Sequence, residues 1–109
     1  MTEEMREPTY LLLVSLAGGR QHGYGLMQSV FELSDGRVKL QAGTLYGALE
    51  RLTREGLVVP DGEEVANGRL RRFHVLSDDG LTALREQTVR RTASVQAGVA
   101  RLRALGVQA

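Results

Sequence analysis

Two segments, 42–57 and 68–80, constrain the fold of this chain more than any other part of the sequence. The first reads AGTLYGALERLTREGL and has leucines at positions 45, 49 and 52, which is the spacing of one narrow apolar helix stripe. The second reads GRLRRFHVLSDDG, follows Asn67, and contains an arginine-rich strand pattern. Because Asn-Gly is a strong signal for a tight hairpin turn, the two segments predict a helix followed by a basic β-hairpin.

The spacing of apolar residues predicts three further helices. The first begins at Pro8 and ends at Gly18-Gly19, the second covers about residues 24–33, and the last runs from about 78 to 105 behind the N-cap residue Ser77. The charged residues 1–7 are expected to fray.

A strand is expected to start at 57–59, with Pro60 keeping it at an edge of the sheet, and its return strand is expected at 70–76. Val38 and Leu40 alternate with basic residues, which predicts a further, very short strand.

Together these elements predict a mainly α chain with a small β-hairpin, an α+β fold in a single domain of 109 residues. A helix followed by a basic hairpin is typical of a winged helix-turn-helix, which places one helix in a DNA groove and the hairpin beside it. We expect residues 1–76 to form a winged helix-turn-helix DNA-binding domain. Residues 77–109 are expected to form a C-terminal dimerisation helix that belongs to the same compact unit.

The last helix carries a stripe with nearly heptad spacing, in which two threonines, Thr88 and Thr92, separate its apolar members. A helix of this length projects beyond a small domain, so its stripe needs a partner, and a symmetric homodimer is the usual solution. The residues predicted to mediate dimerisation are Leu81, Leu84, Val95, Val99 and Leu102.

Composition sets limits on the class of protein. The net charge is only +1, but residues 37–72 hold seven Lys and Arg against five Asp and Glu, and three arginines cluster at 69–72. The absence of cysteine excludes disulfides, zinc–cysteine sites and thiol catalysis, and fits the cytoplasm. The longest apolar stretch, 10–17, is too short to span a membrane, so no membrane partner is expected.

The candidate DNA-binding residues of the helix lie on the side opposite its leucines. We expect Thr44 and Tyr46 to bind phosphates, although Tyr46 packing on the preceding helix is the alternative. Gly47 either permits close approach to DNA beside Gly43 or is a tolerated weakness that costs about 1 kcal/mol in a helix.

Arginines supply the other candidates. Arg51 and Arg54 have the length to reach guanine edges or phosphates, whereas Glu50 and Arg54 also have the spacing of an ordinary surface ion pair. Arg69, nearest the hairpin tip, and Arg71 are the expected contacts of the hairpin, against the alternative of a solvated charge run.

Catalytic and metal sites find no support in the sequence. His22 and His74 lack acidic or thiol companions at ligand spacing, and no serine has a base and an orienting acid nearby. We therefore expect neither an enzyme nor a metal or other cofactor.

Three motifs in order resemble the PadR family of bacterial transcriptional regulators over about residues 8–85. They are HGYG at 22–25, GTLYGALERLTREGL at 43–57, and RRFHVLSDDG at 71–80. A single C-terminal helix is similar to the short subgroup of the family. The resemblance implies a winged-helix homodimer that represses transcription from a double-stranded DNA operator, and some relatives are relieved by phenolic compounds or lipophilic drugs.

The chain departs from the family pattern at several positions. Relatives often carry proline where this chain has Ala42 and Gly47, and often have a second aromatic where it has His74. Drug-responsive relatives use a tryptophan in the last helix, and this chain has none.

These observations favour a sequence-specific repressor that binds a pseudo-palindromic operator as a homodimer, with the two reading helices about 34 Å apart. A small aromatic or lipophilic effector between the subunits is a further hypothesis. The alternative is a winged-helix module that docks a protein and binds no DNA; only a DNA binder would lose affinity for DNA steeply as salt rises.

Overall fold

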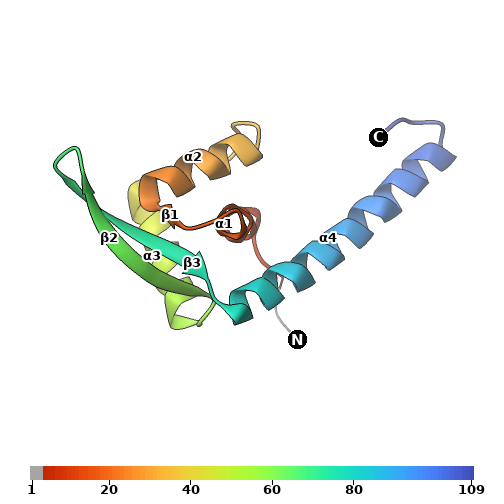
Figure 1. Ribbon diagram of the computed structural model, residues 1–109. Helices are drawn as coiled ribbons and strands as arrows, with labels where there is room; N and C mark the ends of the chain where they lie inside the picture. Colours follow the sequence, from red (N-terminus) through yellow and green to blue (C-terminus); the bar gives the residue numbers. More distant parts are fainter. Residues whose placement is uncertain (1–3) are drawn as a thin grey trace.

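The computed structural model describes residues 4–109, which form four helices and a three-stranded antiparallel sheet (Figure 1). In chain order the elements are α1 (Glu7–Ala17), β1 (Gln21–His22), α2 (Gly23–Leu33), α3 (Ala42–Arg54), β2 (Val58–Ala66), β3 (Arg69–Leu76) and α4 (Asp78–Ala104). The arrangement confirms the predicted α+β class and the winged helix-turn-helix followed by one long helix.

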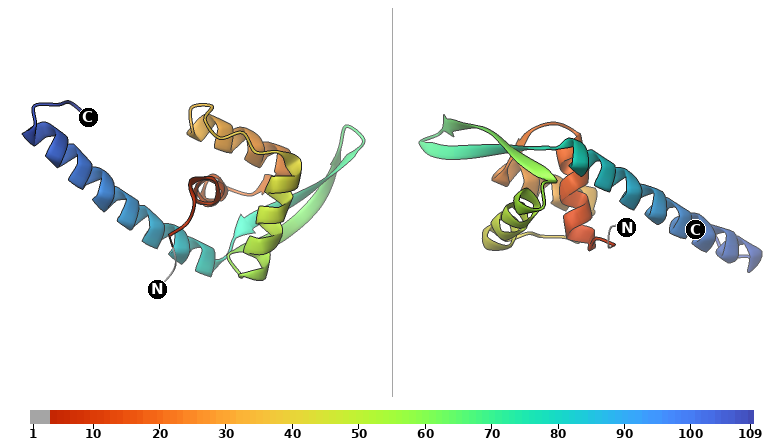
Figure 2. Two further views of the ribbon diagram at one scale, coloured as in Figure 1. Left: turned by 180° about the vertical axis from the view of Figure 1, so that it is seen from behind. Right: turned by 90° about the horizontal axis from the view of Figure 1, so that it is seen from below.

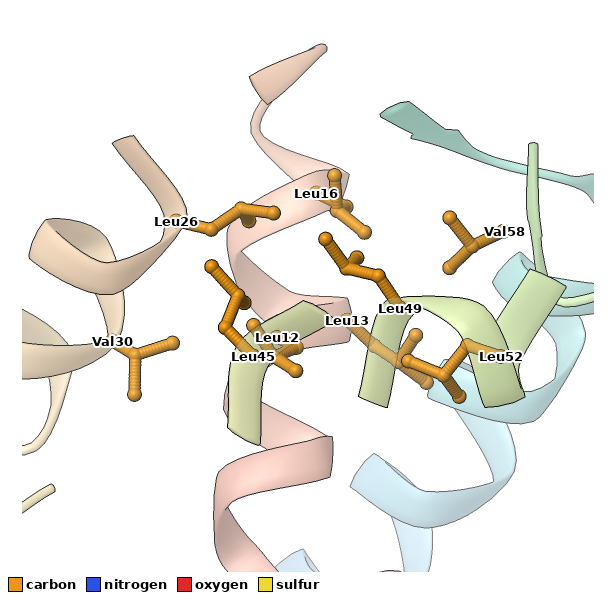
Figure 3. Packing of buried hydrophobic residues seen from close by; sticks show 9 residues of the cluster. All are labelled: Leu12, Leu13, Leu16, Leu26, Val30, Leu45, Leu49, Leu52 and Val58. Atoms are coloured by element: carbon orange, nitrogen blue, oxygen red, sulfur yellow. The ribbon is translucent and has the colours of Figure 1, made fainter. Parts of the chain in front are cut away.

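The core is formed by apolar side chains from α1, α2 and α3 that point toward one another, closed by one strand residue (Figure 3). Each buried leucine or valine stabilises the fold by about 1.5–3 kcal/mol relative to an exposed position. Because α3 contributes only its leucine stripe to this cluster, its opposite side faces solvent. The cluster consists of Leu12, Leu13, Leu16, Leu26, Val30, Leu45, Leu49, Leu52 and Val58.

The hairpin of β2 and β3 projects from this core on the side opposite to the free end of α4 (Figure 2). Its turn residues Asn67 and Gly68 both have positive φ, 52° and 74°, which matches the twist of a tight hairpin. The strand order is β1-β3-β2, so β2 with its Pro60 lies at an edge, as predicted. A bulge between Pro60 and Glu63 interrupts the pairing of the two long strands.

One predicted strand is absent from residues 34–41, and one short strand was not predicted. Val38 and Leu40 do pack partly against the core, but they have no strand partner, so the segment between α2 and α3 is irregular. The two-residue strand β1 was not predicted. It forms because Gln21 pairs with His74 and His22 with Phe73, contacts that span half the chain and leave no local pattern.

The first turns of α4 pack against the body, and the rest of the helix projects beyond it (Figure 1). The residues of α4 that are buried are Gly80, Ala83 and Gln87, a face adjacent to the predicted apolar stripe. Gly80 is required where it stands, because a Cβ there would overlap the carbonyl oxygen of Leu57. The long projection makes the molecule 56 × 30 × 21 Å in extent.

The segment before α1 is held against α4, which corrects the expectation of a frayed arm for residues 4–6. The amide of Met5 donates a hydrogen bond of 3.0 Å to Oε1 of the buried Gln87, and its carbonyl accepts one from Arg91. Arg91 in turn lies over the Tyr10 ring, 4.3 Å from its centre. Glu7 already belongs to α1, and residues 1–3 lie outside the described residues.

Candidate nucleic-acid interface

The solvent-facing side of α3 is smooth near its N-terminus and charged near its C-terminus. Gly43, Thr44 and Gly47 are exposed, and a Cβ added at either glycine would have no atom within 4 Å. A flat, hydroxylated surface of this kind allows the helix backbone to approach a phosphate or a groove floor closely.

Tyr46 extends from α3 across the start of α2. Its hydroxyl lies so close to Gly23 that a Cβ there would come within 2.5 Å of the oxygen. The side chain remains 53% exposed, and its hydroxyl has no hydrogen-bond partner among residues 4–109. Tyr46 therefore packs on α2, as the alternative prediction had it, and at the same time presents a free hydroxyl to solvent.

The two arginines of α3 are both engaged within the chain. Arg54 forms the predicted surface pair with Glu50 at 3.4 Å, an interaction worth only about 0.2–0.5 kcal/mol and therefore easily exchanged. Arg51 turns toward α1 and donates a hydrogen bond of 3.0 Å to the Thr9 hydroxyl. Arg54 is paired along its own helix, and its side chain is 66% exposed.

The arginines of β3 divide between the two faces of the hairpin. Arg69 and Arg71 lie on one face, and Arg72 lies on the face shared with Leu76, which packs on the core. Arg72 is paired with Glu63 at 3.4 Å. No carboxylate of residues 4–109 lies within ion-pair distance of Arg69 or Arg71.

A cleft of about 630 Å³ separates the hairpin from the start of α2 and from α3. Residues 22–24, Tyr46, Asn67 and residues 69–72 line it, and of the three arginines among them Arg69 and Arg71 share one face of the hairpin. No Asp or Glu of the described chain is among these lining residues. A cleft with cationic walls and no acid favours an anionic occupant.

The structure assigns His22 a place that sequence reasoning missed. His22 is the N-cap of α2, and its Nδ1 accepts a hydrogen bond of 3.2 Å from the Gly25 amide. Its other ring nitrogen, Nε2, lies 3.3 Å from Nη1 of Arg71 at the cleft. The local signals were the HGYG motif that starts at His22 and its place just before the predicted helix 24–33, and neither points to Arg71, which is 49 residues away along the chain.

His74 occupies a different environment on β3. Its Nδ1 is buried without a hydrogen-bond partner. Burial lowers the pKa of His74 below its usual value, and the nearby Arg72 charge lowers it further.

The predicted dimerisation residues are distributed along α4. Leu84 packs partly against the core, so it is engaged within the chain. Leu81, Val95 and Leu102 are exposed, and Val99 is half-exposed.

Residues 4–109 offer neither a metal-binding cluster nor a membrane-spanning helix. No group of three or more His, Asp or Glu side chains has the arrangement of a metal site there. Over the same residues, every helix is too short or too polar to cross a bilayer.

A sequence profile described as "Transcriptional regulator PadR-like family" matches residues 12–86 of the chain. This match spans the core, the exposed face of α3, the hairpin and the start of α4. A search of curated proteins gave no match.

Solved structures of transcriptional regulators share the fold of this chain. Bacillus subtilis PadR in complex with operator DNA matches with a TM-score of 0.67 and 21% identity, over 77% of this chain and 48% of that chain. A PadR family transcription regulator from hypervirulent Clostridium difficile matches with a TM-score of 0.67 and 24% identity, over 85% and 97% of the two chains. A PadR family transcriptional regulator from Eggerthella lenta matches with a TM-score of 0.62 and 26% identity, over 88% and 83%.

Proposed function

Because the chain belongs to the PadR-like family of transcriptional regulators, we propose that it is a repressor that binds a pseudo-palindromic DNA operator as a homodimer. Members of this family are transcription regulators and not enzymes. The observation that carries the proposal is the continuous surface formed by the smooth side of α3 and the acid-free arginine cleft beside it. The similar Bacillus subtilis PadR structure contains operator DNA, which supports the choice of partner.

In this proposal α3 enters the major groove and the hairpin lies beside it. Thr44 and Tyr46 bind phosphates, Gly43 and Gly47 permit close approach, and Arg54 exchanges Glu50 for a base edge or a phosphate. Arg69 and Arg71 contact the backbone from the hairpin. Arg51 contributes only after it releases Thr9.

In this proposal residues 1–76 bind DNA and residues 77–109 form the dimer. The projecting half of α4 carries Val95, Val99 and Leu102, and an unpartnered apolar stripe of this kind favours pairing with a second copy. The pairing angle of the two α4 helices would then set the distance of about 34 Å between the reading helices. Such a regulator acts in the cytoplasm, where its operator lies.

We further propose that a small aromatic or lipophilic molecule between the subunits relieves repression by changing that angle. Thr88 and Thr92 make the middle of the stripe polar and less tightly packed than leucines would. Thermal-shift screening with phenolic acids and lipophilic drugs should find a compound that raises the unfolding temperature and releases DNA. A panel without any binder would refute this part of the proposal.

The test of DNA binding is the salt dependence of affinity for duplexes enriched from a random pool. Affinity should fall steeply between 50 and 200 mM salt, because each neutralised phosphate releases counterions. Replacing Arg54 or Arg69 with alanine should reduce the slope of log K against log salt by about 1 each. Arg85→Ala, an exposed arginine of α4, is the matched control and should leave the slope unchanged.

A DNA affinity that is weak and insensitive to salt, with no effect of either arginine, would contradict the proposal. That result would favour the protein-docking alternative, in which apolar surface substitutions affect binding instead.

A further inference from the structure

The two ring nitrogens of His22 cannot both accept hydrogen bonds. Nδ1 accepts from the Gly25 amide at 3.2 Å, and an amide N–H has no other role than donor. The single proton of the neutral imidazole is therefore on Nε2, which makes Nε2 a donor.

Nε2 nevertheless faces another donor. Nη1 of Arg71 lies 3.3 Å from it, and a guanidinium has no acceptor atom. The contact brings two N–H groups together with nothing between them to receive either hydrogen. An acceptor with more than one lone pair, placed beside both nitrogens, would satisfy both donors at once.

The surroundings select an anion as that acceptor. The cleft that both residues line is also lined by Tyr46, whose hydroxyl is free, and by Arg69, and no carboxylate lines it within the described chain. The nearest acids on the hairpin are already engaged, Glu63 with Arg72 and Glu64 with Arg20, both at 3.4 Å.

We propose that Nε2–H of His22 and the guanidinium of Arg71 bind one phosphate group of the DNA backbone, with the Tyr46 hydroxyl as a third contact. The inference rests on the proposed function, because α3 and the hairpin present this cleft to the duplex. It assigns His22 a role in DNA binding beyond capping α2. Contact with a phosphate fixes the register of the protein on the duplex and carries no sequence information.

His22→Asn separates the two roles of this residue. Asparagine is a favourable N-cap residue, so its side-chain oxygen can accept from the Gly25 amide, while its shorter amide places no donor at the position of Nε2. We expect an unfolding temperature close to that of the wild type and an affinity about tenfold lower on every duplex, since a hydrogen bond to a charged group is lost. The salt slope should not change, because a neutral donor displaces no counterion.

Arg71→Gln is the companion variant, and it should lower both the affinity and the salt slope, the latter by about 1. If both side chains bind the same phosphate, the double variant should lose less affinity than the product of the two single losses. Arg72→Gln is the matched control from the next position of β3. Because Arg72 lies on the other face of the hairpin, the loss of DNA affinity in the double variant with His22→Asn should equal the product of the two single losses.

The decisive measurement is a scan of the enriched duplex in which each phosphate in turn is replaced by a neutral methylphosphonate. One position should weaken the wild type and have much less effect on both His22→Asn and Arg71→Gln. A scan in which both variants keep the wild-type pattern, or a fully multiplicative double variant, overturns the inference while leaving DNA binding intact. A wild type that binds no duplex would instead overturn the proposed function itself.

A comparison with inorganic phosphate shows whether the bound phosphate group belongs to the DNA backbone or comes from free phosphate. Nitrogen resonances of the His22 ring should respond to a short duplex at micromolar concentration and not to equimolar inorganic phosphate. An equal response to free phosphate would overturn the assignment to the DNA backbone.

Discussion

At the scale of single residues, His74 shows how burial of an ionisable group makes the stability of the fold depend on pH. Its Nδ1 is enclosed without a partner, and its position beside Arg72 adds a repulsive charge. Both effects lower the pKa of His74 and disfavour the protonated ring in the folded state.

The folded chain should consequently lose stability as pH falls. In the unfolded chain His74 takes up a proton near pH 6.5, whereas the folded chain resists this down to its lower pKa. The free energy of unfolding that the neutral His74 ring contributes is therefore fully present above about pH 7. It decreases as pH drops through 6.5, and it stays constant below the pKa of His74 in the folded chain. Urea unfolding at fixed protein concentration should show a slope of at most about 1.4 kcal/mol per pH unit from this group.

His74→Phe is the comparison for this measurement, since relatives often carry an aromatic residue there. The difference in unfolding free energy between the wild type and His74→Phe should itself vary with pH in the stated direction. A difference that stays constant from pH 8 to pH 5 would show that His74 is not responsible.

Glycines of two helices provide a second contrast at the residue scale. Gly80→Ala should lower the free energy of unfolding by more than about 2 kcal/mol, because the new Cβ overlaps the Leu57 carbonyl. Gly47→Ala meets open space and should raise it by about 0.5–1 kcal/mol, since alanine favours the helix. Thermal or urea unfolding of the two variants measures both changes.

Gly47→Ala also tests why glycine stands on the exposed side of α3. If the helix backbone approaches DNA closely, this more stable variant should bind the enriched duplex at least about tenfold more weakly. Unchanged affinity would identify Gly47 as a tolerated weakness of the helix.

At the scale of elements, the ends of the helices differ in how much they depend on side chains. Ser77 caps α4: its hydroxyl accepts from the Gly80 amide at 3.0 Å and donates to the Gly56 carbonyl. Gln41, at the corresponding position of α3, makes no side-chain capping bond. The start of α4 is thus tied to the turn after α3, and the start of α3 depends on its leucine stripe.

Ser77→Ala should therefore lower the free energy of unfolding by about 1 kcal/mol, or somewhat more because two hydrogen bonds are lost. Gln41→Ala is the control at the equivalent helix position and should change it by less than about 0.5 kcal/mol. Equal effects of the two substitutions in urea unfolding would contradict the capping role of Ser77.

At the scale of the whole molecule, α4 has exposed valines on two sides. Val95 belongs to the predicted dimer stripe, whereas Val89 lies on another side of the helix, and the two are similarly exposed, at 64% and 60%. The two positions would differ in their response to substitution only if a second copy of the chain packs against the stripe that contains Val95.

Val95→Asp should dissociate the proposed dimer, because it would bury a carboxylate without a partner in the interface. Val89→Asp should leave the dimer intact. Sedimentation at several concentrations measures the oligomeric state, and the unfolding temperature of the wild type should rise with concentration whereas that of Val95→Asp should not. A wild type that is monomeric at all concentrations would refute the homodimer.

The sequence by itself was sufficient to predict the helices, the hairpin turn and which side of α3 is exposed. Each of these depends on periodicity or on backbone preference over a few residues, as with the leucines of α3 and Asn67-Gly68. The PadR-like motifs are local in the same sense.

Only the tertiary structure decided how distant residues combine. It brought His22 to Arg71, laid Tyr46 over Gly23, turned Arg51 toward Thr9 and paired β1 with β3. These contacts join residues separated by 23 to 53 positions, and their geometry depends on how the helices pack around the leucine core. No pattern within a short stretch of chain encodes that packing, so the cleft became visible only in the folded molecule.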